Sequence, residues 1–135
     1  MQYLDLLLLD EEEARRVSRR NHIHDAIEHL LRRGAGIVAV KSGARGCVVG
    51  QGDELFKVQA YRARPVSTIG AGDAFDAAFI YGLLQKWDLR KTAQFANVAG
   101  AISTTEFGCM TAIPKARVVE RICESYYGRL RAGKS

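Results

Sequence analysis

The chain has 135 residues and a formal net charge of +5, with 47% hydrophobic and 26% charged residues, which suits one globular domain and excludes a disordered or fibrous chain. The basic residues are spread along the chain without interleaved aromatic residues, so the sequence argues against a nucleic-acid partner. No apolar run is long enough for a secretory signal or a membrane span, and the three widely spaced cysteines suit free thiols in a reducing compartment; both features predict a cytoplasmic protein without a membrane partner.

The N-terminal part alternates apolar strands with helices. The leucine run at 6–9 predicts a strand that is buried on both faces. A helix opens after it at Asp10, with acidic residues in its first turn and arginines in its later turns. A second helix is expected from 22 to 33, where apolar residues recur at helical spacing up to Gly34. Residues 37–40 predict the next buried strand.

In the middle of the chain, the sequence predicts short strands separated by glycine-rich turns. Turns are expected at 41–46 and 50–53, because each segment holds two glycines among polar residues. Strands are expected at 47–49 and 55–58, where the residues are mainly apolar.

Three helices are expected in the C-terminal part. The helix at 73–86 is apolar on almost every side, which predicts that it is buried all round. The next helix, at 89–105, has Asp88 as its N-cap, and the last has Pro114 in its first turn. The order of elements predicts an α/β layered fold with a mainly parallel sheet over the whole chain, 1–135.

The central feature of the sequence is the segment 70–73, in which a Gly-Ala-Gly turn leads into the helix that begins at Asp73. Glycines let the backbone approach a ligand closely, and the helix start offers free N–H groups and a positive dipole end. Together these features favour a phosphate or another anion. Asp73 either accepts a proton from an attacking hydroxyl or caps the helix.

Other polar clusters fall where predicted strands end, at the edge where open α/β sheets bind ligands. Asp10 and Glu13 suit Mg²⁺ held partly through water, or form a solvated helix start. The turn at 41–46 suits a nucleotide phosphate, or is a plain hairpin turn. Asn97 either faces a base or ribose or is a satisfied buried amide.

For two further groups of side chains, the sequence favours a structural interpretation over a binding site. His22, His24 and His29 lie close together in sequence, but no carboxylate or thiol completes a metal site, so we expect surface residues. Tyr81 and Trp87 are expected to anchor the end of a helix in the core.

The segment 67–80, which reads STIGAGDAFDAAFI, resembles the C-terminal signature of the ribokinase-like carbohydrate kinases, also called the phosphofructokinase-B family. The family's usual pattern is Asp-Thr-x-Gly-Ala-Gly-Asp, with Phe two residues on. Four other segments resemble family segments in the same order: 8–14, 40–46, 95–101 and 107–109. The resemblance covers nearly the whole chain and implies a three-layer α/β/α Rossmann-like (ribokinase-like) fold.

The resemblance implies ATP-dependent phosphorylation of a hydroxyl on a sugar or sugar-like alcohol. Asp73 would take the proton of that hydroxyl. The backbone N–H groups of Gly70, Ala71 and Gly72 would bind the transferring phosphoryl group. Phosphoryl transfer depends mostly on positioning and charge stabilisation, which these groups can provide.

The resemblance also assigns residues to cofactors. Asp10 and Glu13 would order Mg²⁺ and its waters, with Asp10 in place of the family's Asn. The ATP site would be lined by Lys41, Ser42, Gly43, Gly46 and Asn97. A monovalent cation (K⁺) would lie beside the anion hole, at positions that match Ser67, Ile69, Ser103, Glu106 and Gly108. Ser67 replaces the Asp that many members use there, so it departs from the family's pattern.

Family members are about twice as long as this chain, so the resemblance implies that 1–135 is the C-terminal, nucleotide-binding portion of such a kinase. The N-terminal sugar-binding half and the lid would then be absent. We expect the chain to be inactive alone, and to pair with a complementing N-terminal half or to form a homo-oligomer. The alternative is a non-catalytic nucleotide-binding, regulatory or association module derived from such a kinase.

Overall fold

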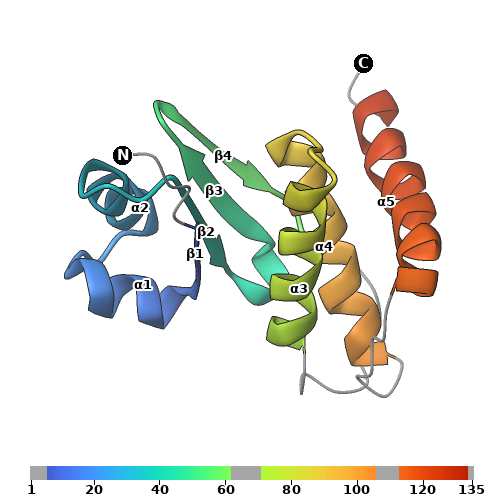
Figure 1. Cartoon of the computed structure of the whole chain (residues 1–135), viewed down its shortest axis with the longest axis horizontal. Coiled ribbons are helices and arrows are strands. Elements are labelled where there is room, and N and C mark those ends of the chain that lie inside the picture. The colour runs from blue at the N-terminus through green and yellow to red at the C-terminus, as the bar shows by residue number, and fades with distance from the viewer. Residues whose placement is uncertain (1–5, 62–70, 106–112, 134–135) are drawn as a thin grey trace. The chain divides into compact units, whose positions relative to one another are not determined.

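The computed structural model describes residues 6–61, 71–105 and 113–133 (Figure 1). The chain divides into two compact units, Met1–Gln59 and Ala60–Ser135. The first contains a four-stranded sheet and two helices, and the described part of the second contains three helices.

The first unit begins with the predicted strand and helix. Strand β1 spans Leu6–Asp10 and helix α1 spans Glu11–Ser18. Residues 6–9 are only half-buried, so the expectation that this strand is buried on both faces is wrong for the described part of the chain. Asp10 ends the strand in an extended conformation and serves as the N-cap of α1. The acidic first turn and the arginines of the last turn both complement the helix dipole.

A second helix completes the connection between two parallel strands. Helix α2 spans Ile23–Arg32, and strand β2 spans Ile37–Lys41 and pairs with β1 in parallel. Parallel neighbours need a crossover connection, which α1 and α2 provide. Gly34, at a φ of +115°, makes the turn that leads from α2 toward β2.

The remaining strands form two hairpins. Strand β3 spans Cys47–Gln51 and pairs antiparallel with β2; strand β4 spans Glu54–Val58 and pairs antiparallel with β3. The order is β1-β2-β3-β4. Two of the three described pairs are therefore antiparallel, so the expectation of a mainly parallel sheet is wrong for this part of the sheet. The connections around β3 are too short for a crossover, which is why the strands reverse direction.

The turn expected at 50–53 is shorter than the sequence suggested. Only Gly52 and Asp53 connect the two strands, and Gly50 lies inside β3. A Cβ at Gly50 would come within 2.5 Å of Cγ2 of Ile27 on α2. Glycine is present here because the helix packs closely on the strand, and not because the chain turns.

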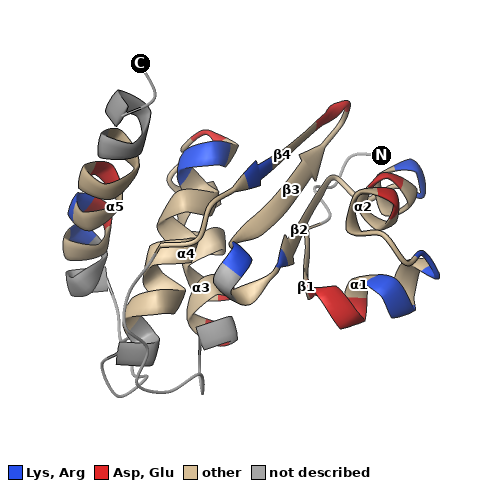
Figure 2. Cartoon of the chain, turned by 180° about the vertical axis from the view of Figure 1, so that it is seen from behind, with Lys and Arg blue, Asp and Glu red and all other residues tan. Residues whose placement is uncertain are grey.

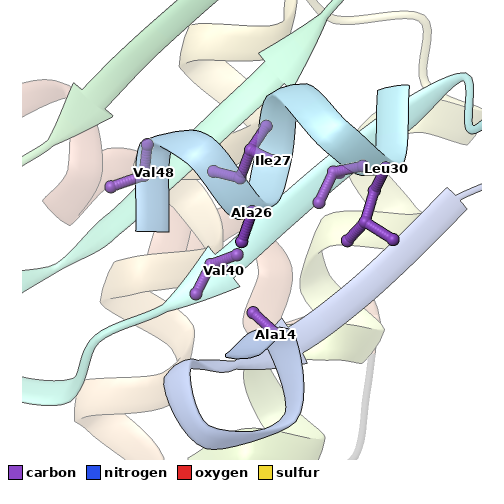
Figure 3. Close-up of a cluster of buried hydrophobic side chains, with 7 residues drawn as sticks. Ala14, Ala26, Ile27, Leu30, Val40 and Val48 are labelled. Carbon is purple, nitrogen blue, oxygen red and sulfur yellow. The ribbon is translucent and has the colours of Figure 1, made fainter. Parts of the chain in front are cut away.

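The core of the first unit lies between its helices and one face of the sheet (Figure 3). Ala26, Ile27 and Leu30 of α2 pack with Val40 of β2 and Val48 of β3. Val40 and Val48 are paired in the register, so their side chains share a face. Ala14 of α1 belongs to the same cluster, so both helices lie on one side of the sheet. The carboxyl ends of the parallel strands β1 and β2 lie together at one end of the sheet.

The second unit consists of helices packed on one another. Helix α3 spans Ala71–Leu84, α4 spans Leu89–Thr105 and α5 spans Ile113–Gly133. The start of α4 agrees with the prediction, because Asp88 Oδ1 accepts a hydrogen bond of 2.7 Å from the N–H of Lys91.

Helix α3 is buried on one side only. Phe75 and Phe79 are buried, whereas Ile80 and Leu84 are 45% and 74% exposed. The expectation that this helix is buried all round is therefore wrong: α3 is apolar on more sides than the described part of its unit covers.

Aromatic rings pack at the connection between α3 and α4, as expected, although Tyr81 and Trp87 are only half-buried. Trp87 meets Tyr81 and Phe95 edge to face, with ring centroids 5.7 and 5.0 Å apart. The ammonium of Lys91 lies 4.2 Å from the centre of the Trp87 ring. Among the residues that the structure describes, no helix is long and apolar enough to cross a membrane.

Candidate nucleotide and phosphoryl-transfer site

The first unit brings the residues predicted for Mg²⁺ and all of those predicted for the nucleotide except Asn97 to one edge of its sheet. Strands β1 and β2 run parallel, and their last residues, Asp10 and Lys41, are register partners. Helix α1 starts after the first strand and the turn 42–46 follows the second. Ligands bind in open α/β sheets at this carboxyl edge.

Asp10 and Glu13 form a capping box at the start of α1. Oδ1 of Asp10 accepts a hydrogen bond of 2.7 Å from the N–H of Glu13, and Oε1 of Glu13 accepts one of 2.9 Å from the N–H of Asp10. The structure therefore shows an acidic helix start, one of the two alternatives from the sequence, in which both side chains cap the helix. Each bond engages one of the two oxygens of a carboxylate, so both acids keep an oxygen that can accept a further bond.

The turn 42–46 is closed by its own backbone. The N–H of Ser42 donates to the carbonyl of Gly46 at 2.7 Å, around a short 3₁₀ turn, Gly43–Arg45. Gly43 and Gly46 have φ values of +57° and +90°, which only glycine adopts readily. The prediction of a glycine turn is confirmed, and Gly43 is exposed at its surface.

An ion pair joins this turn to helix α1. Nη2 of Arg45 lies 2.8 Å from Oε1 and 2.9 Å from Oε2 of Glu11. No pattern in the sequence pointed to this pair. The two residues are 34 positions apart and follow no periodic pattern, so only the strand pairing of Asp10 with Lys41 could have suggested it.

The second unit contains the start of the central helix. Ala71 and Gly72 open α3, and Asp73 lies in its first turn with an exposed side chain. The helix start favours negative charge, from a ligand or from the aspartate itself. Gly70 lies outside the described residues.

Asn97 is 9% exposed on α4, and its side-chain amide donates a hydrogen bond of 3.2 Å to the hydroxyl of Tyr127 on α5. The amide is therefore buried and hydrogen-bonded, and its place beside a base or ribose stays a prediction. Tyr127 was not identified from the sequence.

The residues expected at the monovalent-cation site fall mostly outside the described part of the chain. Ser67, Ile69, Glu106 and Gly108 lie outside the described residues, and Ser103 lies on α4 without a described side chain. Among the residues that the structure describes, no three His, Cys, Asp or Glu side chains gather as a metal-binding group.

The histidines lie at the surface of α2 and near it. His22 and His24 are exposed, and Nδ1 of the half-buried His29 lies 3.3 Å from Nη2 of Arg20. Partial burial and the nearby charges of Arg20, Arg33 and Arg32 lower the pKa of His29. These positions agree with the expectation of surface residues.

A family model described as "pfkB family carbohydrate kinase" matches residues 1–116. The chain is 29% identical, over 102 residues, to the 5-dehydro-2-deoxygluconokinase of Bacillus subtilis (strain 168). This match covers 75% of the chain and 31% of that relative, so the chain spans about a third of the length of the curated relatives it matches.

Solved structures of kinases share the fold. The ribokinase of Thermotoga maritima matches with a TM-score of 0.78 and 27% identity, over 89% of this chain and 43% of that one. A protein from Escherichia coli assigned as ribokinase II, solved with ATP and Mg²⁺, matches with a TM-score of 0.77 and 27% identity, over 93% of this chain and 39% of that one. The ribokinase-like α/β fold is thereby confirmed, and the chain belongs to the pfkB family of carbohydrate kinases.

Proposed function

We propose that this chain supplies the ATP and Mg²⁺ site, the anion hole and the catalytic base of an ATP-dependent kinase that phosphorylates a sugar or sugar-like alcohol. The observation that carries the proposal is the family match over residues 1–116, which includes the Gly-Ala-Gly-Asp segment at 70–73. Family membership favours this function over a non-catalytic module.

Asp73 would act as the general base. Its exposed carboxylate, in the first turn of α3, would take the proton of the acceptor hydroxyl as that oxygen attacks the terminal phosphorus of ATP. The N–H groups at Gly70, Ala71 and Gly72 would donate to the oxygens of the transferring phosphoryl group. Preorganised donors at a helix start stabilise negative charge in this way.

The turn of the first unit would bind the nucleotide. Lys41 provides a positive charge beside the turn, while Ser42, Gly43 and Gly46 shape a backbone that phosphate oxygens can approach. Asn97 would lie beside the nucleotide, with its amide oriented by Tyr127.

The carboxylates at the start of α1 fit a metal bound through water. Asp10 and Glu13 each keep one oxygen outside the capping box, and no third acid joins them among the described residues. Mg²⁺ usually keeps several waters and takes one or two carboxylates together with substrate phosphates, which matches this donor set. When bound, the ion would neutralise charge on the phosphates during transfer.

The sugar-binding part would come from further polypeptide. The chain spans about a third of the length of its curated relatives, and of the residues assigned above only Asp73 would touch the sugar, at its reacting hydroxyl. We propose that a complementing N-terminal half, or a second copy of the chain, completes the site. A monovalent cation at Ser67, Ile69, Ser103, Glu106 and Gly108 is part of the same proposal.

The test is a calorimetric titration of the purified chain with ATP and Mg²⁺, together with an assay of phosphate transfer to sugars. We expect ATP binding that strengthens with Mg²⁺ and little or no transfer by the chain alone. Asp73→Asn should leave ATP binding in place. The control variant Asp76→Asn, three residues further along α3, should also leave it in place. Absence of ATP binding would overturn the nucleotide assignment, and Asp73-dependent transfer by the chain alone would overturn the expected inactivity.

A further inference from the structure

Glu11 and Arg45 make the shortest described ion pair in the first unit. One guanidinium nitrogen of Arg45 lies 2.8 and 2.9 Å from the two oxygens of Glu11, whose side chain is 20% exposed. The neighbouring pair, Glu12 with Arg16, is 3.5 Å long and its side chains are 84% and 68% exposed. Arg45 is as exposed as Arg16, at 68%, so the two pairs differ in length and in the exposure of the acid. Short contacts between charged groups are the stronger ones.

The first pair joins the two elements of the candidate nucleotide site. Glu11 follows Asp10 directly and begins α1, whose acidic first turn is red in Figure 2. Arg45 is the last residue of the 3₁₀ turn that follows β2. The ion pair therefore ties the predicted phosphate turn to the predicted metal-binding helix start.

The turn 42–46 has limited support of its own. Its described backbone bonds run from the N–H groups of Ser42, Arg45 and Gly46 to carbonyls within the same turn, at 2.7 to 3.0 Å. A segment with two glycines loses much conformational freedom when it is ordered. An anchor outside the turn reduces the number of alternative conformations that it can adopt.

We propose that Glu11 and Arg45 form a latch that holds the turn 42–46 in its nucleotide-binding conformation before the nucleotide arrives, which makes both of them positioning residues. This inference rests on the proposed function. The latch stabilises the turn in the absence of ligand, so ATP binding does not bear the cost of ordering it. Glu11 also keeps its favourable place at the positive end of the helix dipole.

The test measures amide hydrogen exchange of the turn in the nucleotide-free chain, and then ATP affinity. In Glu11→Gln, the amides of Ser42 and Gly46 should exchange about two- to fivefold faster, the range that the usual strength of an accessible ion pair implies. The matched control is Glu12→Gln, which removes the same charge from the next residue and should change neither amide. Arg45→Gln should reproduce the faster exchange, whereas Arg45→Lys should restore slow exchange, because a single nitrogen makes both contacts.

ATP affinity should fall by a similar factor in Glu11→Gln and stay unchanged in Glu12→Gln. Unchanged exchange in Glu11→Gln, or equal acceleration in Glu12→Gln, would overturn the latch whatever the ligand. Faster exchange with unchanged ATP affinity would overturn its positioning role. Absence of ATP binding by the unaltered chain would instead overturn the proposed function, and the exchange result would still decide whether the turn is latched.

Discussion

The side-chain amide of Asn97 on α4 donates a hydrogen bond to the hydroxyl of Tyr127 on α5, with 3.2 Å between nitrogen and oxygen. Both side chains are almost fully buried, at 9% and 5% exposure. The bond joins two helices, and the two residues that form it are 30 positions apart in sequence. It therefore fixes the packing of α5 on α4 and the orientation of the Asn97 amide together.

Tyr127→Phe should lower the free energy of unfolding by about 1 kcal/mol, because it removes one buried hydrogen bond and leaves the ring in place. Urea unfolding measures this change. The matched control is Tyr126→Phe: the hydroxyl of Tyr126 lies 3.5 Å from the carbonyl of Ala60, where a hydrogen bond is weak. Equal losses in the two variants would show that the Asn97 bond contributes nothing specific.

Gly82→Ala should destabilise the second unit. The new Cβ would lie 2.8 Å from both Cγ2 and Oγ1 of Thr92, a fully buried side chain on α4. Thr92 cannot easily turn aside, because its hydroxyl donates to the carbonyl of Asp88 at 2.9 Å. Overpacking costs about 1–3 kcal/mol, which exceeds the gain of about 1 kcal/mol from replacing a helical glycine by alanine.

The matched control for this substitution is Gly128→Ala on α5. A Cβ at Gly128 would meet nothing within 4 Å, so this variant should keep the helix gain and raise stability by about 0.5–1 kcal/mol. The two alanine variants should therefore shift the urea midpoint in opposite directions. A stabilised Gly82→Ala would contradict the close contact between α3 and α4.

Local patterns predicted most of the elements. The apolar run that forms β1, the helical spacing of α2 and the cap at Asp88 all act within a few residues, so the sequence shows them directly. The turn expected at Gly50 was wrong because that prediction also considered only neighbouring residues. Glycine marks a turn when the cause is local, but here the cause is the approach of Ile27 from another element.

The candidate site was predicted in part. The glycine turn and the helix start with Asp73 agree with the sequence, because both are encoded in consecutive residues. The pairs of Glu11 with Arg45 and of Asn97 with Tyr127 join residues 34 and 30 positions apart. Such pairs depend on how strands and helices are arranged in space, and no periodicity in the sequence reports them.

Cys123 should be unreactive in the folded chain. Burial raises the pKa of its thiol to about 12, with the charge of Glu124 adding to the rise and that of Lys91 opposing it. The thiolate is the reactive form, so iodoacetamide at pH 8 should label Cys123 only after unfolding, which peptide mass spectrometry measures site by site. Labelling of Cys123 in the native chain would contradict its burial.

The raised pKa of the Cys123 thiol also affects the stability of the fold at high pH. The folded state holds the thiol proton over the window between its ordinary pKa of 9.0 and about 12, where the unfolded state releases it. Stability from this group is therefore complete below pH 9 and declines as pH rises through the window. Cys123→Ala should unfold with a weaker dependence on pH between 9 and 11 than the unaltered chain, measured by urea midpoints.

Two substitutions at Asp10 separate its capping role from its proposed role toward Mg²⁺. Asp10→Ala removes the oxygen that accepts from the N–H of Glu13 at 2.7 Å and should lower the free energy of unfolding by about 1 kcal/mol. Asp10→Asn keeps an acceptor oxygen, and asparagine caps helices as well as aspartate, so its stability should stay close to that of the unaltered chain. Both variants lose the same negative charge.

Calorimetric titration with ATP, with and without Mg²⁺, then reports on the metal. If the carboxylate helps to hold Mg²⁺, the two variants should lose the same share of the Mg²⁺-dependent gain in ATP affinity, although only Asp10→Ala is destabilised. An unchanged Mg²⁺ dependence in Asp10→Asn would restrict Asp10 to helix capping. A loss in Asp10→Ala alone would mean that the position of α1, and not the charge at its start, governs nucleotide binding.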